Sequence, residues 1–116
     1  MRALIVDDDA LNRDILRRFL GRLGYDSEEA ASGLEGLAAC RNARYDVALI
    51  DLVLPDLDGV DTATAIREAC APRDTPIRLI AVTGARSDER VRRAFDAVVE
   101  KPYTLDELAA VISARS

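Results

Sequence analysis

Carboxylates stand directly after two of the apolar runs in this sequence, where a buried strand would end. Asp7–Asp9 follow the run at 3–6, and Asp51 follows the run at 47–50. A buried carboxylate without a partner is costly in free energy, or it takes up a proton to avoid that cost. These aspartates therefore need a partner, and a group of carboxylates at the end of a sheet suits a cation.

Two further polar residues end the other apolar runs. Thr83 follows the run at 76–82, and Lys101 stands one residue beyond the run at 97–99. Lys101 is also the only lysine among the 16 basic residues of the chain. In an open parallel sheet, ligands bind beyond the carboxyl ends of the strands. We therefore expect Thr83 and Lys101 to share one edge of the sheet with the aspartates.

The combined chemistry of these residues fits phosphoryl transfer to an aspartate. Asp7, Asp8 and Asp51 would repel one another, and a divalent cation such as Mg²⁺, which prefers oxygen ligands, relieves this repulsion. A carboxylate can act as a nucleophile toward phosphorus and form an aspartyl phosphate. The transfer depends on positioning and charge neutralisation, which the cation, Lys101 and the Thr83 hydroxyl would supply.

Each of these residues also has a purely structural interpretation. Asp8 or Asp9 would cap the helix that follows, and Asp51 would cap a turn. Thr83 would close a strand, and Lys101 would be a solvated charge. Taken together, these alternatives require a cluster of carboxylates and one lysine to gather at one edge by accident, so the sequence favours the site.

The elements that position these residues alternate between strands and helices. Apolar runs predict strands at 3–6, 47–50, 76–82 and 97–99, with a weak edge strand at 27–31. Apolar residues at helical spacing predict helices around 11–23, 34–38, 60–66, 91–95 and 105–112, the last with a capping box of Thr104 and Glu107. This alternation predicts one α/β domain over residues 1–116, a doubly wound five-stranded parallel sheet with helices on both faces.

The composition excludes several other classes of function. A formal charge of −5 argues against direct binding to nucleic acid or to an anionic membrane. The apolar runs are too short to cross a bilayer, and the amino-terminal segment does not read as a signal peptide, which favours the cytoplasm. Cys40 and Cys70 read as two buried thiols rather than as a disulfide or a zinc site.

Four motifs, in this order and at this spacing, resemble the receiver domain of bacterial two-component response regulators. They are "VDDD" (6–9), "DLVLPDLDG" (51–59), "AVTG" (81–84) and "EKPY" (100–103). The resemblance covers the whole chain. It implies a flavodoxin-like fold with the strand order 2-1-3-4-5.

The resemblance also implies the roles of individual residues. Asp7 and Asp8 would be metal-binding acids, and Asp51 would be the phosphoacceptor and a further ligand of Mg²⁺. Val53 would contribute its backbone carbonyl to the ion.

Two more residues and the partners follow from the same resemblance. Thr83 would be the switch hydroxyl, Lys101 would bind the phosphoryl group, and the Lys101–Pro102 peptide would be cis. The phosphodonor would be a phosphohistidine on a sensor histidine kinase or a phosphotransfer protein. The chain has no histidine, so it would receive and not donate.

The sequence departs from the family pattern in the segment that forms part of the usual signalling face of receivers. Val98 stands where receivers usually have an aromatic residue, and Phe95 and Tyr103 are candidates to stand in for it. The segment 83–101 is about one helical turn shorter than the family leads us to expect. It also holds Arg86, Arg90, Arg92 and Arg93, which would meet an acidic partner or form a solvated helix face.

Other functions remain as alternatives. A phosphohydrolase of the haloacid-dehalogenase type also uses an aspartate nucleophile, but it has a second acid where this chain has Val53. A receiver-like module that binds partners without phosphorylation is the other alternative, against which the complete set of motif residues weighs. The expected role is that of a signalling acceptor and not of an enzyme, with an output protein that the sequence does not identify. The initial methionine modestly favours a stand-alone protein over a piece of a larger regulator.

Overall fold

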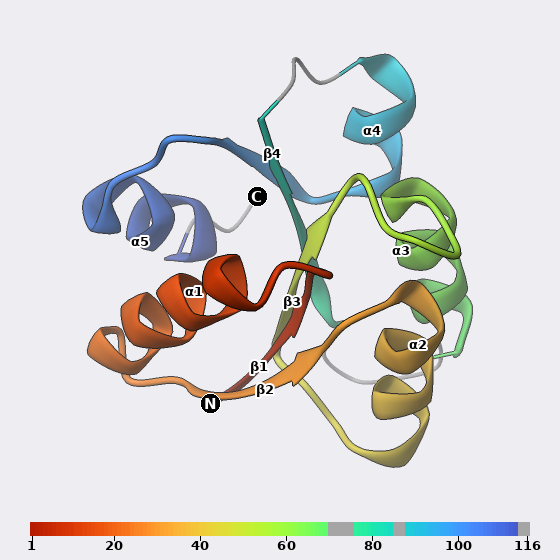
Figure 1. The fold of residues 1–116 in the computed structure, drawn as a ribbon, viewed down its shortest axis with the longest axis horizontal. Coiled ribbons are helices and arrows are strands. Elements are labelled where there is room, and N and C mark those ends of the chain that lie inside the picture. Colours follow the sequence, from red (N-terminus) through yellow and green to blue (C-terminus); the bar gives the residue numbers. More distant parts are fainter. Residues whose placement is uncertain (70–75, 85–87, 114–116) are drawn as a thin grey trace.

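The computed structural model describes residues 1–69, 76–84 and 88–113, in which strands and helices alternate (Figure 1). The strands are β1 (Arg2–Val6), β2 (Asp26–Ala30), β3 (Val47–Asp51), β4 (Arg78–Thr83) and β5 (Ala97–Glu100). The helices are α1 (Ala10–Arg22), α2 (Gly33–Asn42), α3 (Gly59–Ala69), α4 (Glu89–Ala94) and α5 (Leu105–Ser113). Each predicted element is present in its predicted order.

The five strands form one parallel sheet in the order β2-β1-β3-β4-β5. The predicted doubly wound architecture and strand order are therefore confirmed. Because all strands run in the same direction, their carboxyl ends meet at one edge of the sheet. The register places Asp51 opposite Val82, so that Thr83 lies one residue beyond the partner of Asp51.

Helices cover both faces of the sheet, with α1 and α5 on one side and α2, α3 and α4 on the other (Figure 1). Alternate strand residues point to opposite faces. Leu4 and Val6 of β1 pack with the α2–α3–α4 layer, whereas Ala3 and Ile5 pack with α1 and α5. This double burial explains why the central strands read as continuous apolar runs.

Polar side chains fix where several helices begin. The Asp9 carboxylate accepts a hydrogen bond from the Leu11 N–H and caps α1. The Thr104 hydroxyl accepts one from the Glu107 N–H, which confirms that Thr104 caps α5. These caps satisfy backbone donors that a helix leaves unpaired at its first turn.

The edge strand β2 carries acidic side chains that pair with neighbouring elements. Glu28 forms an ion pair with Arg2 and accepts a hydrogen bond from the Tyr45 hydroxyl. Glu29 forms an ion pair with Arg13 of α1. The weak apolar signal of this strand follows from its place at the edge, where one side is open to water.

At the amino end of β4, Arg78 links this strand to α5. Its guanidinium donates a hydrogen bond of 3.0 Å to the carbonyl oxygen of Val111 in the last turn of α5. The carbonyls in the last turn of a helix carry partial negative charge, which a guanidinium complements.

Strands β3 and β4 each extend one residue beyond the carboxyl end of the predicted run. Asp51 and Thr83 are the last residues of β3 and β4 rather than the first residues after them, because the ladder continues through both. The predicted run at 76–82 enters the sheet only at Arg78. Cys40 is a buried thiol as predicted, whereas Cys70 lies outside the described residues.

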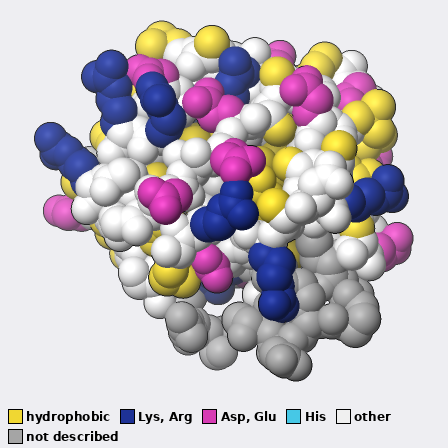
Figure 2. All heavy atoms as spheres, turned by 90° about the horizontal axis from the view of Figure 1, so that it is seen from below, with side chains coloured by type: hydrophobic (Ala, Val, Ile, Leu, Met, Phe, Trp, Pro, Cys, Tyr) yellow, Lys and Arg dark blue, Asp and Glu magenta, His cyan; other side chains and the backbone are white. Residues whose placement is uncertain are grey.

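Figure 2 shows a face on which acidic and basic side chains are interspersed with hydrophobic and neutral ones. The two signs therefore partly cancel on this face. None of the helices in the described ranges is long and apolar enough to span a bilayer.

Candidate functional site

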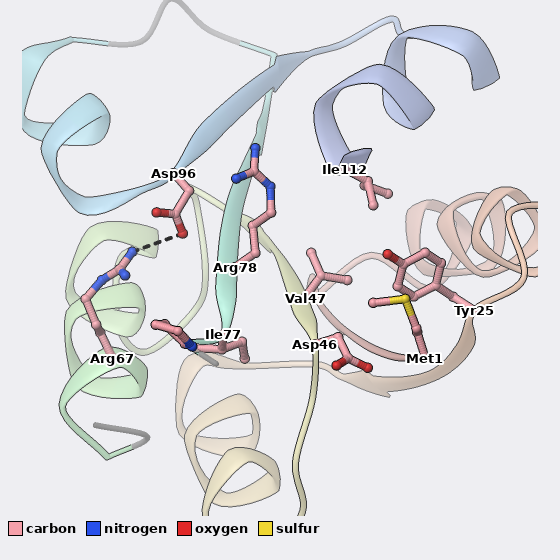
Figure 3. A pocket seen from close by; sticks show the side chains of 10 residues that line it. Met1, Tyr25, Asp46, Val47, Arg67, Ile77, Arg78, Asp96 and Ile112 are labelled. Atoms are coloured by element: carbon pink, nitrogen blue, oxygen red, sulfur yellow. Dashed lines mark hydrogen bonds and ion pairs between the residues drawn. The ribbon is translucent and has the colours of Figure 1, made fainter. Parts of the chain in front are cut away.

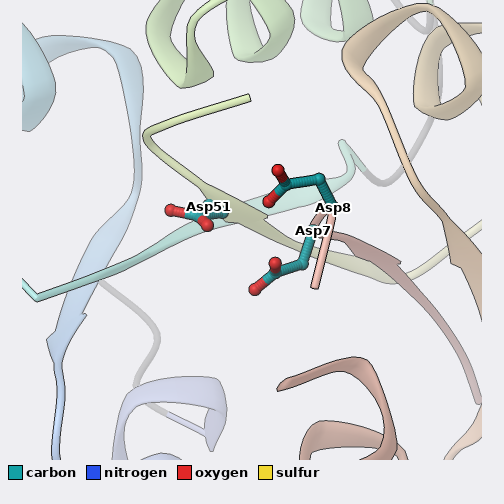
Figure 4. Close-up of side chains that lie close together, drawn as sticks. All are labelled: Asp7, Asp8 and Asp51. Atoms are coloured by element: carbon teal, nitrogen blue, oxygen red, sulfur yellow. The ribbon is translucent and has the colours of Figure 1, made fainter. Parts of the chain in front are cut away.

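Three carboxylates converge where β1 and β3 end (Figure 4). Asp7 and Asp8 follow β1, and Asp51 ends β3 on the neighbouring strand. One oxygen from each can be chosen such that all three lie within 4.8 Å of one another. Asp7 is buried, Asp51 is half-buried and Asp8 is exposed. The structure thus brings together the three acids that the sequence singled out.

Backbone and side-chain contacts hold Asp7 in place from three directions. Its N–H donates to the Ala30 carbonyl, and its own carbonyl accepts a hydrogen bond of 2.7 Å from Arg13. Its Oδ1 accepts a hydrogen bond of 2.9 Å from the Asp9 N–H. Oδ2 is buried and has no hydrogen-bond partner among the described residues. A buried oxygen without a partner costs free energy, so this atom is suited to accept an ion.

The pKa of Asp7 reflects the same lack of a compensating positive charge. Burial raises the pKa of Asp7 above its usual value, and the negative charges of Asp51 and Asp8 raise it further. The hydrogen bond from the Asp9 N–H and the charge of Lys101 oppose this rise without cancelling it. A cation bound among the three carboxylates would remove the repulsion between them.

Lys101 and Thr83 complete this edge of the sheet. Thr83 is buried at the end of β4, and its carbonyl accepts a hydrogen bond of 2.7 Å from the Lys101 N–H. The Lys101–Pro102 peptide is cis, as predicted. The Lys101 Nζ atom lies 4.0 Å from Asp7 Oδ2, too far for a hydrogen bond but close enough for an ion pair.

Asp8 and Asp9, the two candidates for the cap of α1, make different contacts in the structure. Asp9 is the cap and adopts the extended backbone that a capping residue needs. Asp8 belongs to the carboxylate cluster instead. The structural interpretation is therefore correct for Asp9, and the sequence could not separate the two because both precede the helix.

The loop that follows Asp51 is tightly closed. The Val53 N–H donates to Asp51 Oδ1 at 3.1 Å, and the Gly59 N–H donates to the Leu52 carbonyl at 3.0 Å. A Cβ atom at Gly59 would lie 2.6 Å from both the Asp51 carbonyl oxygen and Leu52 Cα. Only glycine allows this approach, so the loop doubles back directly onto the phosphoacceptor candidate.

Asp56 and Arg13 make contacts next to the site residues, although the sequence did not single them out. Asp56 accepts hydrogen bonds from the Gly33 and Leu34 N–H groups at the start of α2. Arg13 contacts the Asp7 carbonyl. These contacts join residues far apart in the chain, and the sequence carries no signal for the first. A basic residue one turn into the helix after "VDDD" is a weak signal for the second.

The segment 83–101, in which the sequence departs from the receiver pattern, holds two short elements, α4 and β5. Val98 is half-buried in β5 and packs with the α2–α3–α4 layer, where Phe95 is also buried. Tyr103 packs on the opposite layer, edge-on to Phe19, with ring centroids 5.8 Å apart. Phe95 and Tyr103 thus lie on opposite faces of the sheet, and neither replaces Val98 within β5.

The arginines of α4 engage acids of the same chain. Arg90 lies 3.3 Å from both Asp58 and Asp61 of the neighbouring α3 region, and Arg93 forms an ion pair with Glu89. These contacts favour the solvated-face interpretation over an acidic partner. Arg86, which the sequence grouped with them, lies outside the described residues.

A separate pocket of about 320 Å³ opens at the amino ends of β3 and β4 (Figure 3). Its acids make structural contacts. Asp46 accepts a hydrogen bond from the Arg2 N–H, and Asp96 accepts one from the Leu79 N–H and pairs with Arg67. The pocket lies at the opposite end of β3 from Asp51 and is no part of the carboxylate site.

Comparison with known proteins decides the family. The family model of the response regulator receiver domain matches residues 3–113. This chain belongs to that family. The match favours the receiver over the haloacid-dehalogenase alternative, because it extends from β1 through α5. Receiver domains are signalling domains that bind Mg²⁺ at an acidic pocket and interact with histidine kinases or phosphotransfer proteins.

Individual relatives agree with the family match. The transcriptional regulatory protein ResD of Bacillus subtilis is 33% identical over 115 residues, covering 97% of this receiver domain and 47% of ResD. A CheY-like receiver domain from Methylobacillus flagellatus superposes with a TM-score of 0.88 at 28% identity, covering 97% of this chain and 95% of that one.

A third relative is the receiver domain of a sensor histidine kinase from Pseudomonas aeruginosa, whose structure has a magnesium ion coordinated in the active site cleft. It superposes with a TM-score of 0.82 at 26% identity, covering 96% of this chain and 93% of that one. The chain spans less than half the length of curated relatives such as ResD.

Proposed function

We propose that Asp51 is the phosphoacceptor of this receiver domain and that Mg²⁺ is held by Asp7, Asp8 and Asp51 with the Val53 carbonyl. The approach of three carboxylates within 4.8 Å carries the proposal. The buried Oδ2 of Asp7 supports it, because this oxygen has no hydrogen-bond partner among the described residues and a metal ion could coordinate it. Oxygen donors of this kind suit Mg²⁺, which also retains several waters. The magnesium ion in the Pseudomonas aeruginosa relative is a further support.

In the proposed reaction, an oxygen of the ionised Asp51 carboxylate attacks the phosphorus atom of a phosphohistidine on a kinase or phosphotransfer protein. The new O–P bond forms as the P–N bond breaks, and the imidazole keeps the electron pair and takes up a proton. Mg²⁺, when bound, supplies positive charge to the phosphoryl oxygens. The remaining work of the chain is to position the acceptor and to bind the transferred group.

Lys101 and Thr83 would bind the other phosphoryl oxygens. The Lys101 ammonium group already lies at this edge, 4.0 Å from Asp7 Oδ2, and a compact point charge suits a phosphoryl oxygen. The Thr83 hydroxyl belongs to the last residue of β4, next to β3. Phosphorylation would then change how the domain binds an output protein. A cytoplasmic location is part of the same proposal.

The test is phosphate incorporation from acetyl phosphate with and without Mg²⁺, measured by intact-protein mass spectrometry. The parent should take up one phosphoryl group only with Mg²⁺, and Asp51→Asn should take up none. Asp61→Asn removes an exposed carboxylate outside the cluster and is the matched control. Equal incorporation in Asp51→Asn would overturn the assignment. A parent that accepts no phosphate would favour a module that binds partners without phosphorylation.

A further inference from the structure

The amino terminus of α2 is capped by a residue from the loop after Asp51. Asp56 Oδ1 accepts a hydrogen bond from the Gly33 N–H, and Oδ2 accepts one from the Leu34 N–H, both at 2.9 Å. Ser32 provides the local cap, because its hydroxyl accepts from the Glu35 N–H at 3.2 Å. The three N–H groups that precede the first helical hydrogen bond are thus all satisfied, two of them by Asp56.

Helix α2 also packs closely against the end of β1, which leads into Asp7 and Asp8. A Cβ atom at Gly36 would lie 2.8 Å from a methyl group of Val6, which immediately precedes Asp7. A Cβ atom at Gly33 would lie 2.5 Å from the Thr62 hydroxyl of α3. Helix α2 is therefore seated between the end of β1 and the region after β3, with little freedom to move against either.

Asp56 lies only three residues after Val53 in the closed loop. One end of that loop is fixed where Gly59 meets Leu52, and Val53 is fixed by its N–H bond to Asp51. The Asp56 contacts fix the outer part of the loop to α2. Because α2 also contacts Val6, it is a common support for the residues from β1 and from β3.

We propose that Asp56 is a positioning residue of the metal site, which holds the loop 51–59 on α2 and so sets the place of Asp51 and Val53 relative to Asp7 and Asp8. This inference rests on the proposed function of those four residues. Asp56 acts through backbone contacts and touches neither the metal nor the phosphoryl group.

The chemistry of the contact calls for a carboxylate. Both of its oxygens are used at once, on adjacent N–H groups that point out of a helix amino terminus, where negative charge is stabilised. The hydrogen bond from the Leu34 N–H is the largest of several that lower the pKa of Asp56. An asparagine keeps one acceptor oxygen, so it should preserve part of the contact, whereas alanine removes all of it.

The test compares Asp56→Ala with Ser32→Ala, which weakens the same helix terminus without touching the loop. Mg²⁺ is titrated against parent and variants, and binding is followed by the amide signals of Asp8 and Leu52. We expect Asp56→Ala to raise the Mg²⁺ dissociation constant by at least about threefold, less than the roughly 10–100-fold loss for a group bonded directly to a metal ligand, because Asp56 acts through the loop. Ser32→Ala should leave it unchanged, and Asp56→Asn should fall between.

The stability of each variant is measured by urea unfolding, so that loss of fold is not mistaken for loss of binding. If Asp56→Ala does not fold, the comparison of Asp56→Asn with Ser32→Ala decides. A parent that binds Mg²⁺, with Asp56 and Ser32 variants that bind it equally well, would reduce Asp56 to a helix cap and overturn this inference alone. A parent that does not bind Mg²⁺ would overturn the proposed metal site and this inference with it.

Discussion

The Lys101 ammonium nitrogen lies 4.0 Å from Oδ2 of Asp7, and that oxygen is buried without a hydrogen bond from the described residues. The lysine therefore offsets part of the negative charge of the cluster without filling its centre. The Lys101 ammonium group would attract an incoming phosphoryl group, and the carboxylates would attract a metal ion.

Lys101→Ala should separate the two binding events. Without the ammonium group, binding of beryllium fluoride with Mg²⁺ should weaken about tenfold or more, because a hydrogen bond to a charged group is worth about 1.5–3 kcal/mol. Binding of Mg²⁺ alone should be unchanged or tighter, since a positive charge near Asp7 has been removed. Calorimetric titration measures both. Lys101→Arg keeps the charge and is the control, and a parallel loss of both affinities would contradict the expected division of roles.

Asp8→Ala and Asp9→Ala should have opposite profiles. Asp8 is a member of the cluster, so its loss should weaken Mg²⁺ binding with little effect on stability. Asp9 caps α1, so its loss should lower the free energy of unfolding by about 1 kcal/mol and leave Mg²⁺ affinity nearly intact. Urea unfolding and Mg²⁺ titration are run on both variants. Identical Mg²⁺ affinities for Asp8→Ala and the parent would remove Asp8 from the metal site.

Two glycine substitutions should change stability in opposite directions. Gly59→Ala would place a Cβ atom 2.6 Å from backbone atoms that cannot move away cheaply, so we expect a loss of about 2 kcal/mol or more. Gly21→Ala meets nothing within 4 Å in α1 and should gain about 0.5–1 kcal/mol from helix propensity. Thermal unfolding of both variants checks this, and a neutral Gly59→Ala would mean that the loop has more room than the structure shows.

Asp58 should contribute stability that depends on pH. The hydrogen bond from the Asp61 N–H, followed by the charge of Arg90, lowers the pKa of Asp58 from 3.8. A lowered pKa in the folded state stabilises the protein above pH 3.8, and this contribution is lost as the pH falls through the folded value.

Asp58→Asn should therefore be less stable than the parent at pH 6, by no more than about 1 kcal/mol for so exposed a group. The difference should close as the pH falls below about 3.8. Urea unfolding across this range measures it, with Asp106→Asn as the charge-matched control. A constant difference at every pH would assign the effect to packing.

Activation should cause changes that stay near the site. Phosphorylation can shift a conformational equilibrium only through contacts that favour one state. We expect Thr83 and Lys101 to supply such contacts, and Val98 leaves no aromatic side chain within β5 to move inward. We expect the amide signals of residues 83–90 and of Lys101 to shift when beryllium fluoride and Mg²⁺ are added. Residues 85–87 of this range lie outside the described structure. Large shifts along Leu105–Ile112 would show that coupling to α5 survives by another route.

The sequence predicted the sheet and the three acids because both depend on local patterns. Strands buried on both faces leave continuous apolar runs, and parallel strands bring the residues at their carboxyl ends together. Asp7 and Asp51 could be placed at one edge on that basis alone. The ends of β3 and β4 were predicted one residue short, because a polar residue such as Thr83 can still join the ladder.

What the sequence did not reveal depends on contacts between distant segments. Asp56 reaches α2 across more than twenty positions, and its own neighbours look like an ordinary turn. Asp8 and Asp9 differ only in the direction that the backbone gives their side chains. The opposite placements of Phe95 and Tyr103 likewise follow from the packing of two layers, which a single sequence does not specify.

The acidic edge strand has a consequence for the protein at high concentration. An open strand edge can pair with the same edge of a second molecule, and extended sheets grow in this way. Here such pairing would bring Glu28 and Glu29 of one copy toward those of the other, and would disturb their contacts with Arg2 and Arg13. Like charges and lost ion pairs both oppose that approach. The rim of the sheet at β2 should therefore resist growth into fibrils, even though β2 is an edge strand of the described sheet.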